Sequence, residues 1–207
     1  YYLLKRPVKN IIITGNKEVK DYEIIEAANL KNYPSFISIN KSKITKTLKQ
    51  NPFIKDVQIK KNFKFQITIN VTEEKVVAYN LTNQSYLLSN GTYINNKKFL
   101  GVPQLNNYTP EDVLKNFAEE LGKLDEDIIG DISEIEYSPS KNETGETIDS
   151  TRFKLKMKDG NTVYINVKKC NVLSYYNQIY ASLKDKKGVL NLDSGNYERY
   201  VLTLYEE

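Results

Sequence analysis

The sequence predicts an α+β protein of two modules, a small β-α-α-β-β domain followed by a mostly antiparallel β domain with helices packed on its sheet. Three observations lead to this fold class. Apolar residues alternate with polar ones over several short segments, as in half-buried strands. Apolar repeats of three and four residues mark helices between some of them. Residues 1–72 hold 14 basic and 5 acidic residues, whereas residues 73–207 hold 16 and 21, which indicates modules with different partners.

Residues 8–73 predict the smaller domain. Three consecutive isoleucines before Gly15 indicate its first strand, because β-branched residues favour extended backbone. Asp21 and Asn40 each precede an apolar helical repeat, and both residue types are good N-caps. The expected elements are a strand at 8–14, helices after Asp21 and Asn40, the second ending at Asn51-Pro52, and a hairpin of strands around 57–59 and 63–71.

Residues 74–207 predict the larger domain. Asn90-Gly91 and Asp159-Gly160 each lie between alternating apolar segments, which is a strong hairpin signal. Thr109-Pro110 predicts the start of an amphipathic helix that ends at Gly122. The remaining expectations are strands around 76–81, 132–137, 189–192 and 200–204, an extended loop at 102–105, a loop at 138–150 and a helix at 172–183.

Composition excludes several function classes. The chain has no His and a single cysteine, Cys170, so histidine triads, histidine or cysteine zinc sites and internal disulfides are excluded. Cys170 is expected to be a packing residue. Only three of the 30 basic residues are Arg, which disfavours nucleic-acid binding. No apolar stretch approaches the roughly 20 residues of a membrane span. No cofactor or metal is expected.

Enzymatic chemistry would have to come from carboxylates. The acidic groups Glu111-Asp112, Glu119-Glu120 and Asp125-Glu126-Asp127 would suit a glycan hydrolase if one pair lined a cleft. All three lie on or beside a predicted amphipathic helix, where a solvated helix face is the favoured interpretation. We therefore expect a protein that is not an enzyme.

The order and spacing of several motifs resemble one family. IIITGN at 11–16, NPFIKDVQI at 51–59 and ITINVTE at 67–73 are similar to a POTRA domain of the FtsQ/DivIB family of bacterial cell-division proteins. LLSNG at 87–91, VPQL at 102–105, IEYSPSKN at 135–142 and GVLNLDSGNY at 188–197 extend the resemblance over nearly the whole chain, in a Gram-positive-like form. The family often has Pro in the hairpin where this chain has Asn62-Phe63, so altered hairpin geometry within an intact fold is expected.

The resemblance implies a single-pass membrane protein whose extracellular part is this chain, located at the division septum. Residues 1–7 would then be a juxtamembrane remnant of a transmembrane helix that precedes them, 8–73 a POTRA domain and 74–207 a β domain with a C-terminal partner-binding strand. The implied function is a non-catalytic divisome scaffold that helps regulate septal peptidoglycan synthesis. Its implied partners are DivIC/FtsB-like and FtsL-like bitopic division proteins.

The candidate partner-binding residues lie near the C-terminus. A strand around 200–204 at a sheet edge would accept another strand through its unpaired backbone groups. The resemblance implies strand addition there, and the DSG turn at 193–195 matches the family. The candidates are Ser194, Gly195, Tyr197, Tyr200 and Leu202. The alternative is that the tyrosines cover the core.

A second candidate surface is basic. Lys5 and Arg6, which precede the first strand of the first domain, would contact anionic lipid headgroups, and the lysines around its hairpin would contact teichoic acid or wall phosphate. Direct binding of peptidoglycan is also compatible with a scaffold function. The candidates are Lys5, Arg6, Lys55, Lys60, Lys61 and Lys64. A solvated hairpin tip that lysine protects from aggregation is the alternative. Two other functions stay open: a POTRA-bearing polypeptide-translocation component, and an extracellular protein that binds or hydrolyses wall polymer.

Overall fold

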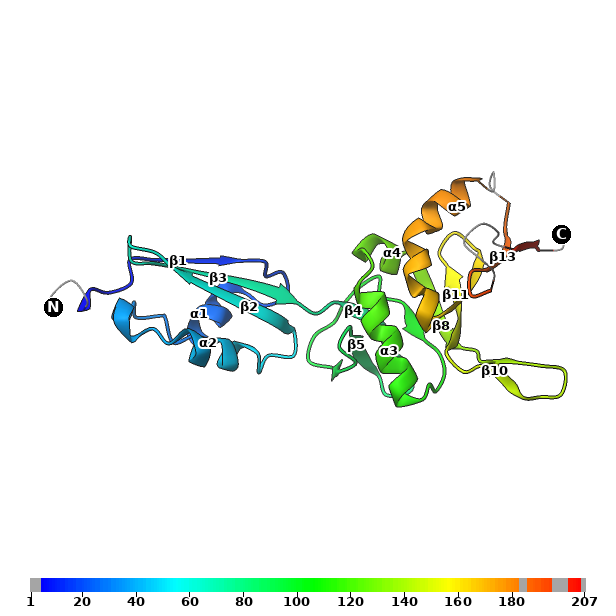
Figure 1. The fold of residues 1–207 in the computed structure, drawn as a ribbon, viewed down its shortest axis with the longest axis horizontal. Coiled ribbons are helices and arrows are strands. Elements are labelled where there is room, and N and C mark those ends of the chain that lie inside the picture. Colours follow the sequence, from blue (N-terminus) through cyan, green and yellow to red (C-terminus); the bar gives the residue numbers. More distant parts are fainter. Residues whose placement is uncertain (1–4, 183–185, 195–200, 206–207) are drawn as a thin grey trace. The chain divides into compact units, whose positions relative to one another are not determined.

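The computed structural model describes residues 5–182, 186–194 and 201–205 (Figure 1). The chain divides into two compact units, one ending at Glu74 and the other beginning at Lys75. Both units contain helices and sheets, so the predicted α+β class is confirmed. None of the described helices is long and apolar enough to cross a membrane.

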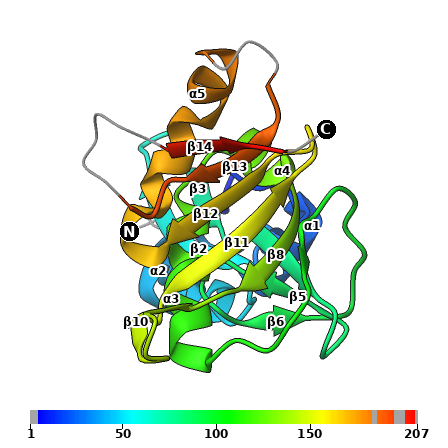
Figure 2. The ribbon, with the colours of Figure 1, turned by 90° about the vertical axis from the view of Figure 1, so that its right-hand side faces the viewer.

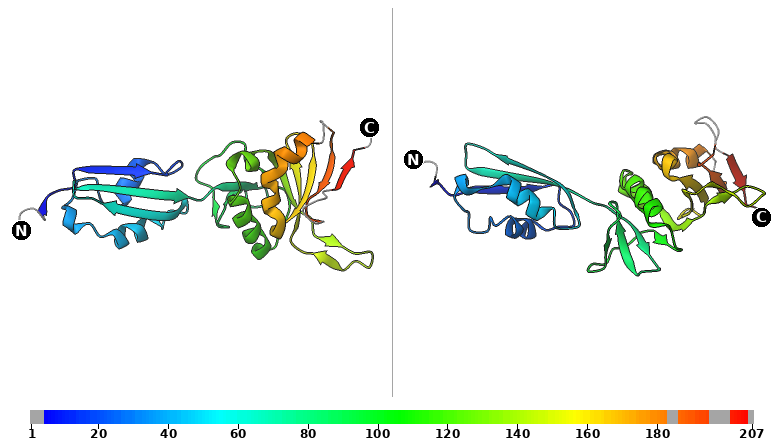
Figure 3. Two further views of the ribbon diagram at one scale, coloured as in Figure 1. Left: turned by 45° about the horizontal axis from the view of Figure 1, so that its top comes forward. Right: turned by 60° about the horizontal axis from the view of Figure 1, so that its bottom comes forward.

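The first unit has the predicted element order β-α-α-β-β. Its strands are β1 (Asn10–Thr14), β2 (Ile54–Lys61) and β3 (Gln66–Glu73), and its helices are α1 (Asp21–Ala27), the 3₁₀ turn η2 (Phe36–Ser38) and α2 (Lys41–Leu48). The strand order is β1-β3-β2, with β1 parallel and β2 antiparallel to the central β3. Both α-helices pack on one face of this sheet (Figure 3).

Alternation in β3 builds the core of the first unit. Ile67, Ile69 and Val71 are buried, whereas the polar residues between them face away from the helices. Ile24 of α1 and Leu48 of α2 are buried over the same face. Removing such side chains from water stabilises the unit by about 1.5–3 kcal/mol each.

Hydrogen bonds that two polar side chains accept from backbone N–H groups stabilise the two ends of this sheet. At one end, the Glu73 carboxylate accepts the backbone N–H groups of Glu18 and Val19 at 2.8 and 2.9 Å, which ties β3 to the loop that precedes α1. At the other end, the Asn62 side chain accepts the Lys64 N–H at 2.9 Å and Phe65 adopts φ +59°. Asn62 therefore closes the β2–β3 turn through an Asx hydrogen bond.

The second unit contains one large sheet and a small hairpin. Its strands are β4 (Val76–Asn80), β5 (Ser85–Leu88), β6 (Tyr93–Ile94), β7 (Gln104–Leu105), β8 (Ile132–Tyr137), β9 (Ser140–Lys141), β10 (Thr147–Asp149), β11 (Arg152–Met157), β12 (Thr162–Asn166), β13 (Gly188–Asn191) and β14 (Val201–Leu204). Nine of them form the order β14-β13-β12-β11-β8-β7-β4-β5-β6, with β9 and β10 separate. Pairing is antiparallel except at β4–β7, β7–β8 and β12–β13, so the sheet is mostly antiparallel as predicted.

Helices cover one face of the large sheet (Figure 2). They are α3 (Glu111–Gly122), α4 (Glu126–Gly130), the 3₁₀ segment η3 (Val167–Tyr175) and α5 (Tyr176–Ser182). Phe117 of α3 stacks on Phe153 of β11 with ring centroids 3.8 Å apart. Cys170 is fully buried, and burial raises its pKa to about 12, so this thiol is a packing residue as expected.

Several local expectations need correction, and one is the strand expected at 63–71, which begins only at Gln66. Residues 138–150 contain the β9–β10 hairpin rather than a loop, because Asn142 accepts the backbone N–H groups of Thr144 and Glu146 and Gly145 supplies φ +87°. The extended segment at 102–105 ends in a paired strand, β7. The helix expected at 172–183 begins earlier, as a 3₁₀ segment capped by Asn166.

Candidate protein-binding edge

The last strand, β14, forms one edge of the nine-stranded sheet. It pairs antiparallel with β13 in a register that joins Gly188 to Leu204 and Asn191 to Val201. Leu204 and the following Tyr205 remain 49% and 44% exposed. Within the described residues no strand lies on the other side of β14.

The direction of the backbone groups of β14 follows from one hydrogen bond. The Tyr205 N–H donates to the Lys187 carbonyl at 3.2 Å, so it points toward β13. In an antiparallel pair the N–H and C=O of one residue point to the same side, and this side alternates along the strand. The N–H and C=O groups of Leu202 and Leu204 therefore point outward, where a further strand would pair.

A glycine permits the close approach of β14 to β13. A Cβ atom added to Gly188 would overlap the Thr203 carbonyl oxygen. The Thr203 carbonyl is backbone, so this overlap cannot be relieved by turning a side chain. Any larger residue at position 188 therefore forces the two strands apart.

A buried polar network holds the start of β13. Asn161 is 1% exposed, and its Oδ1 accepts the Gly188 N–H at 2.9 Å. Its Nδ2 donates to the Tyr176 hydroxyl at 3.1 Å, and this hydroxyl donates to Asp159 Oδ2 at 2.7 Å. Burial and the hydrogen bond to Asp159 raise the pKa of Tyr176 above its ordinary value, so the hydroxyl keeps its proton. This connects helix α5 to the edge of the sheet.

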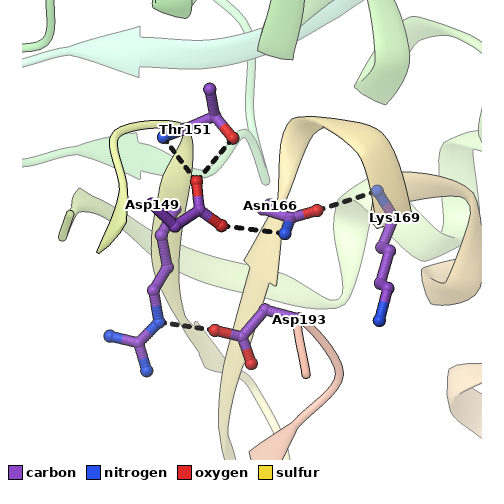
Figure 4. A network of polar contacts seen from close by, with 6 residues as sticks. Asp149, Thr151, Asn166, Lys169 and Asp193 are labelled. Atoms are coloured by element: carbon purple, nitrogen blue, oxygen red, sulfur yellow. Dashed lines mark hydrogen bonds and ion pairs between the residues drawn. The ribbon is translucent and has the colours of Figure 1, made fainter. Parts of the chain in front are cut away.

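An ion pair holds the chain where it leaves β13 (Figure 4). Arg152 Nε lies 2.6 Å from Asp193 Oδ2, and both side chains are mostly buried. The Arg152 guanidinium also lies over the Tyr164 ring at 3.7 Å from the centroid, and the Asp193 N–H donates to the Tyr164 carbonyl at 3.1 Å. Asp193 is thereby anchored to both β11 and β12.

A second carboxylate, that of Asp149, stabilises the turn that precedes Arg152. Asp149 accepts the backbone N–H and the hydroxyl of Thr151, both at 2.8 Å, and the Asn166 amide at 2.9 Å (Figure 4). Burial alone would raise the pKa of Asp149, but these hydrogen bonds and the nearby Arg152 charge outweigh it and hold the pKa below its ordinary value. The ionised form thus stabilises the turn that begins β11.

The structure describes part of the predicted C-terminal site. Ser194 is exposed and directly follows the anchored Asp193. Leu202 lies in β14. Three predicted residues lie outside the described residues: Gly195, Tyr197 and Tyr200. Sequence reasoning missed Gly188, Asn161 and Arg152, which position this edge, although the DSG motif did mark the place where the ion pair forms.

The predicted basic residues divide between the two ends of the first unit. Those at the end where β1 begins are Lys5, Arg6, Lys60, Lys61 and Lys64. Lys55 does not belong with them. It is the second residue of β2, beside Ile54, which pairs with Glu73 at the opposite end of the sheet. A strand advances about 3.3 Å per residue, so Lys55 is separated from the β2–β3 turn by most of the length of β2.

The acidic residues considered for catalysis are exposed except Glu120, which is half-buried and forms an ion pair with Lys123. Glu111, Asp112 and Glu119 lie on the solvent side of α3, and residues 125–127 are exposed at the start of α4. The described residues contain no cluster of acidic and cysteine side chains arranged to hold a metal ion. A pocket of the first unit lies between α1 and α2, and Lys43 is the titratable residue that lines it.

Comparison with known proteins gives consistent matches. A model of the FtsQ-type POTRA domain matches residues 6–74. The cell division protein DivIB of Bacillus subtilis is 31% identical over 197 residues, covering 92% of this chain and 73% of that protein. DivIB of Listeria monocytogenes is 30% identical over 195 residues, covering 90% and 70%. A solved structure, the major extracytoplasmic domain of the trans isomer of DivIB from Geobacillus stearothermophilus, is 25% identical, covers 55% of this chain and 96% of that one, and has a TM-score of 0.43.

Proposed function

The chain belongs to the DivIB family of cell-division proteins, and from this premise we propose that its second unit binds an extended segment of a partner by strand addition along β14. The protein acts outside the cell at the septum as a non-catalytic scaffold. Its partners are DivIC/FtsB-like and FtsL-like membrane proteins, and their docking helps regulate septal peptidoglycan synthesis. Because both partners share the membrane with this protein, modest affinity suffices.

One observation carries the proposal. β14 has the sequence Val-Leu-Thr-Leu, without charge, and the backbone groups of Leu202 and Leu204 point outward from the sheet. An edge of this kind offers main-chain hydrogen bonds to an added strand, while neighbouring side chains provide selectivity. Leu204, within that edge strand, is exposed and supplies apolar contact. Exposure of Glu111, Asp112, Glu119 and residues 125–127 supports a non-catalytic role.

The test measures binding of the 207-residue chain to DivIC and FtsL ectodomains held together by a fused coiled coil. Leu204→Pro removes one outward N–H, whereas Leu204→Ala keeps it and shortens the same side chain. Strand addition predicts a loss of at least about tenfold for the proline variant and a smaller loss for alanine. A chain truncated after Ser194 should not bind.

Folding is checked by circular dichroism for every variant. If the proline and alanine variants bind equally well, the backbone of β14 is not used and the proposal is wrong. If the truncated chain keeps full affinity, the binding surface lies elsewhere in the protein.

A further inference from the structure

One end of the first unit combines positive charge with exposed apolar side chains. The residues at this end, which we call the cationic end, come from the start of β1, the region of η2 and α2, and the β2–β3 turn (Figure 1). Its basic residues are Lys5, Arg6, Lys9, Lys41, Lys60, Lys61 and Lys64. The stretches 5–9, 36–41 and 60–65, which contribute to this end, contain no Asp or Glu, so nothing within them neutralises this charge.

An aromatic pair holds several of these cations in place. Phe36 and Phe65 meet edge to face with centroids 5.4 Å apart. Lys61 Nζ lies 4.5 Å from the Phe36 centroid and donates to the Phe36 carbonyl at 2.8 Å. The Arg6 guanidinium and Lys9 Nζ lie 5.8 and 5.9 Å from the Phe65 centroid. Cation–π contacts therefore position three positive charges around one apolar centre.

Lys61 lies close enough to Lys41 for the two positive charges to repel each other. Burial, and then the like charge of Lys41, lower the pKa of Lys61. An anion brought to this end would relieve that repulsion.

Exposed apolar side chains project at the same end. Phe63, at the tip of the β2–β3 turn, is 102% exposed, and Ile37 in η2 is 56% exposed. A soluble polyanion would gain nothing from an exposed phenylalanine. A lipid bilayer interacts favourably with both kinds of side chain. Basic residues are attracted to its anionic headgroups, and apolar side chains enter its interface.

We propose that the cationic end docks on an anionic lipid bilayer, with Phe63 and Ile37 entering the headgroup region and the surrounding Lys and Arg side chains contacting lipid phosphates. This contact is separate from partner binding at β14. It would hold the first unit against the membrane.

The test is co-sedimentation of the 207-residue chain with vesicles, either of phosphatidylcholine alone or of phosphatidylcholine mixed equally with phosphatidylglycerol. The chain should bind the anionic vesicles and not the neutral ones. Lys64→Glu changes the charge by two units and should weaken binding roughly twenty-five-fold, since each unit of charge near an anionic surface is worth about fivefold. Phe63→Ser should weaken it about fivefold or more.

Matched controls exist in the same chain. Lys55→Glu makes the same charge change at the other end of β2, and Leu100→Ser removes an apolar side chain that is 98% exposed in the second unit. Both should leave vesicle binding unchanged. Leu204→Pro should also leave it unchanged, which separates this surface from the β14 edge.

Several results would overturn the proposal. These are equal binding to neutral and anionic vesicles, no vesicle binding, or equal losses for Lys55→Glu and Lys64→Glu. A further result would assign the surface to a soluble polyanion and show that the lipid proposal is wrong. In that result, soluble wall teichoic acid binds, Lys64→Glu weakens its binding, and Phe63→Ser changes the binding of neither teichoic acid nor anionic vesicles.

Discussion

Two sheet edges of this protein are built in opposite ways. β2, at one edge of the first sheet, has exposed charged residues along it, including Lys55, Asp56 and Lys60. β14, at one edge of the second sheet, has no charged residue. Charges on an edge strand disfavour the addition of a further strand, because pairing would desolvate them. This contrast supports the proposal that β14 accepts a further strand, whereas the charges along β2 disfavour association there.

The other two edges place limits on this comparison. β6 is only two residues long, and a very short edge offers few hydrogen bonds. β1 has no charged residue within its bounds, although Lys9 precedes it directly. If β14 fails the binding test, β1 is the next edge to examine.

The largest expected effect comes from separating β14 from β13. Gly188→Ala places a Cβ atom against the Thr203 carbonyl. Overpacking of this kind against backbone costs about 2–3 kcal/mol, and here it is relieved by the release of β14. We therefore expect partner binding to be lost while the rest of the second unit stays folded, measured by calorimetric binding together with chemical unfolding.

Gly130→Ala is the matched control, because a Cβ atom at Gly130 would meet no described atom within 4 Å. Its stability should change by less than about 1 kcal/mol. Full partner affinity in Gly188→Ala would contradict the role given to the β13–β14 pair.

The next effect concerns the Arg152–Asp193 ion pair, which holds the chain directly after β13. Arg152→Met leaves Asp193 mostly buried without its counter-charge, and Asp193 Oδ1 has no hydrogen-bond partner among the residues that the structure describes. We expect the free energy of unfolding of the second unit to fall by about 2 kcal/mol. The double variant Arg152→Met, Asp193→Leu should recover part of this loss in a double-mutant cycle. Additive single effects would show that the ion pair is not coupled.

Local signals account for much of what the sequence predicted. Asn90-Gly91 and Asp159-Gly160 mark hairpins because glycine adopts positive φ, observed at +82° and +96°. The alternation in β3 and the apolar stripe of α3 needed no knowledge of distant residues. Local patterns of this kind also predicted the element order β-α-α-β-β of the first unit.

The rest depends on contacts between residues far apart in the sequence. Arg152 and Asp193 are 41 positions apart, and Asn161 and Gly188 are 27 apart. No local pattern pairs them. Lys55 was grouped with the hairpin lysines because it is near them in sequence, yet an eight-residue strand carries it to the other end of the sheet. At the proposed site, sequence indicated an edge strand but gave no direction for its backbone groups.

A smaller effect should appear on acidification. The pKa of Asp149 is held below its ordinary value of 3.8, so its contribution to stability is present above that pH and is lost as pH falls through the lower, folded-state value. Asp149→Asn should cost about 1 kcal/mol at neutral pH, after allowance for partial exposure, and should show a weaker acid dependence. Thermal unfolding between neutral pH and pH 3 measures this. Identical acid profiles for both proteins would contradict it.

The smallest change in stability is expected when charge is removed from the β2 edge and added to the β14 edge. These variants are also the most direct test of the comparison between the two edges. Lys55→Thr with Lys60→Thr removes exposed charge from β2, and Thr203→Lys adds one to β14. Each exposed substitution should alter the free energy of unfolding by less than about 0.5 kcal/mol.

The variant with Lys55→Thr and Lys60→Thr should self-associate with rising concentration, because the charges no longer protect the β2 edge. Light scattering detects this association. Thr203→Lys should stay monomeric and lose roughly tenfold in partner affinity, because pairing at the modified edge desolvates the added ammonium group. If both proteins behave like the wild type, charge does not decide which edge accepts a strand, and selectivity has to come from the side chains beside β14.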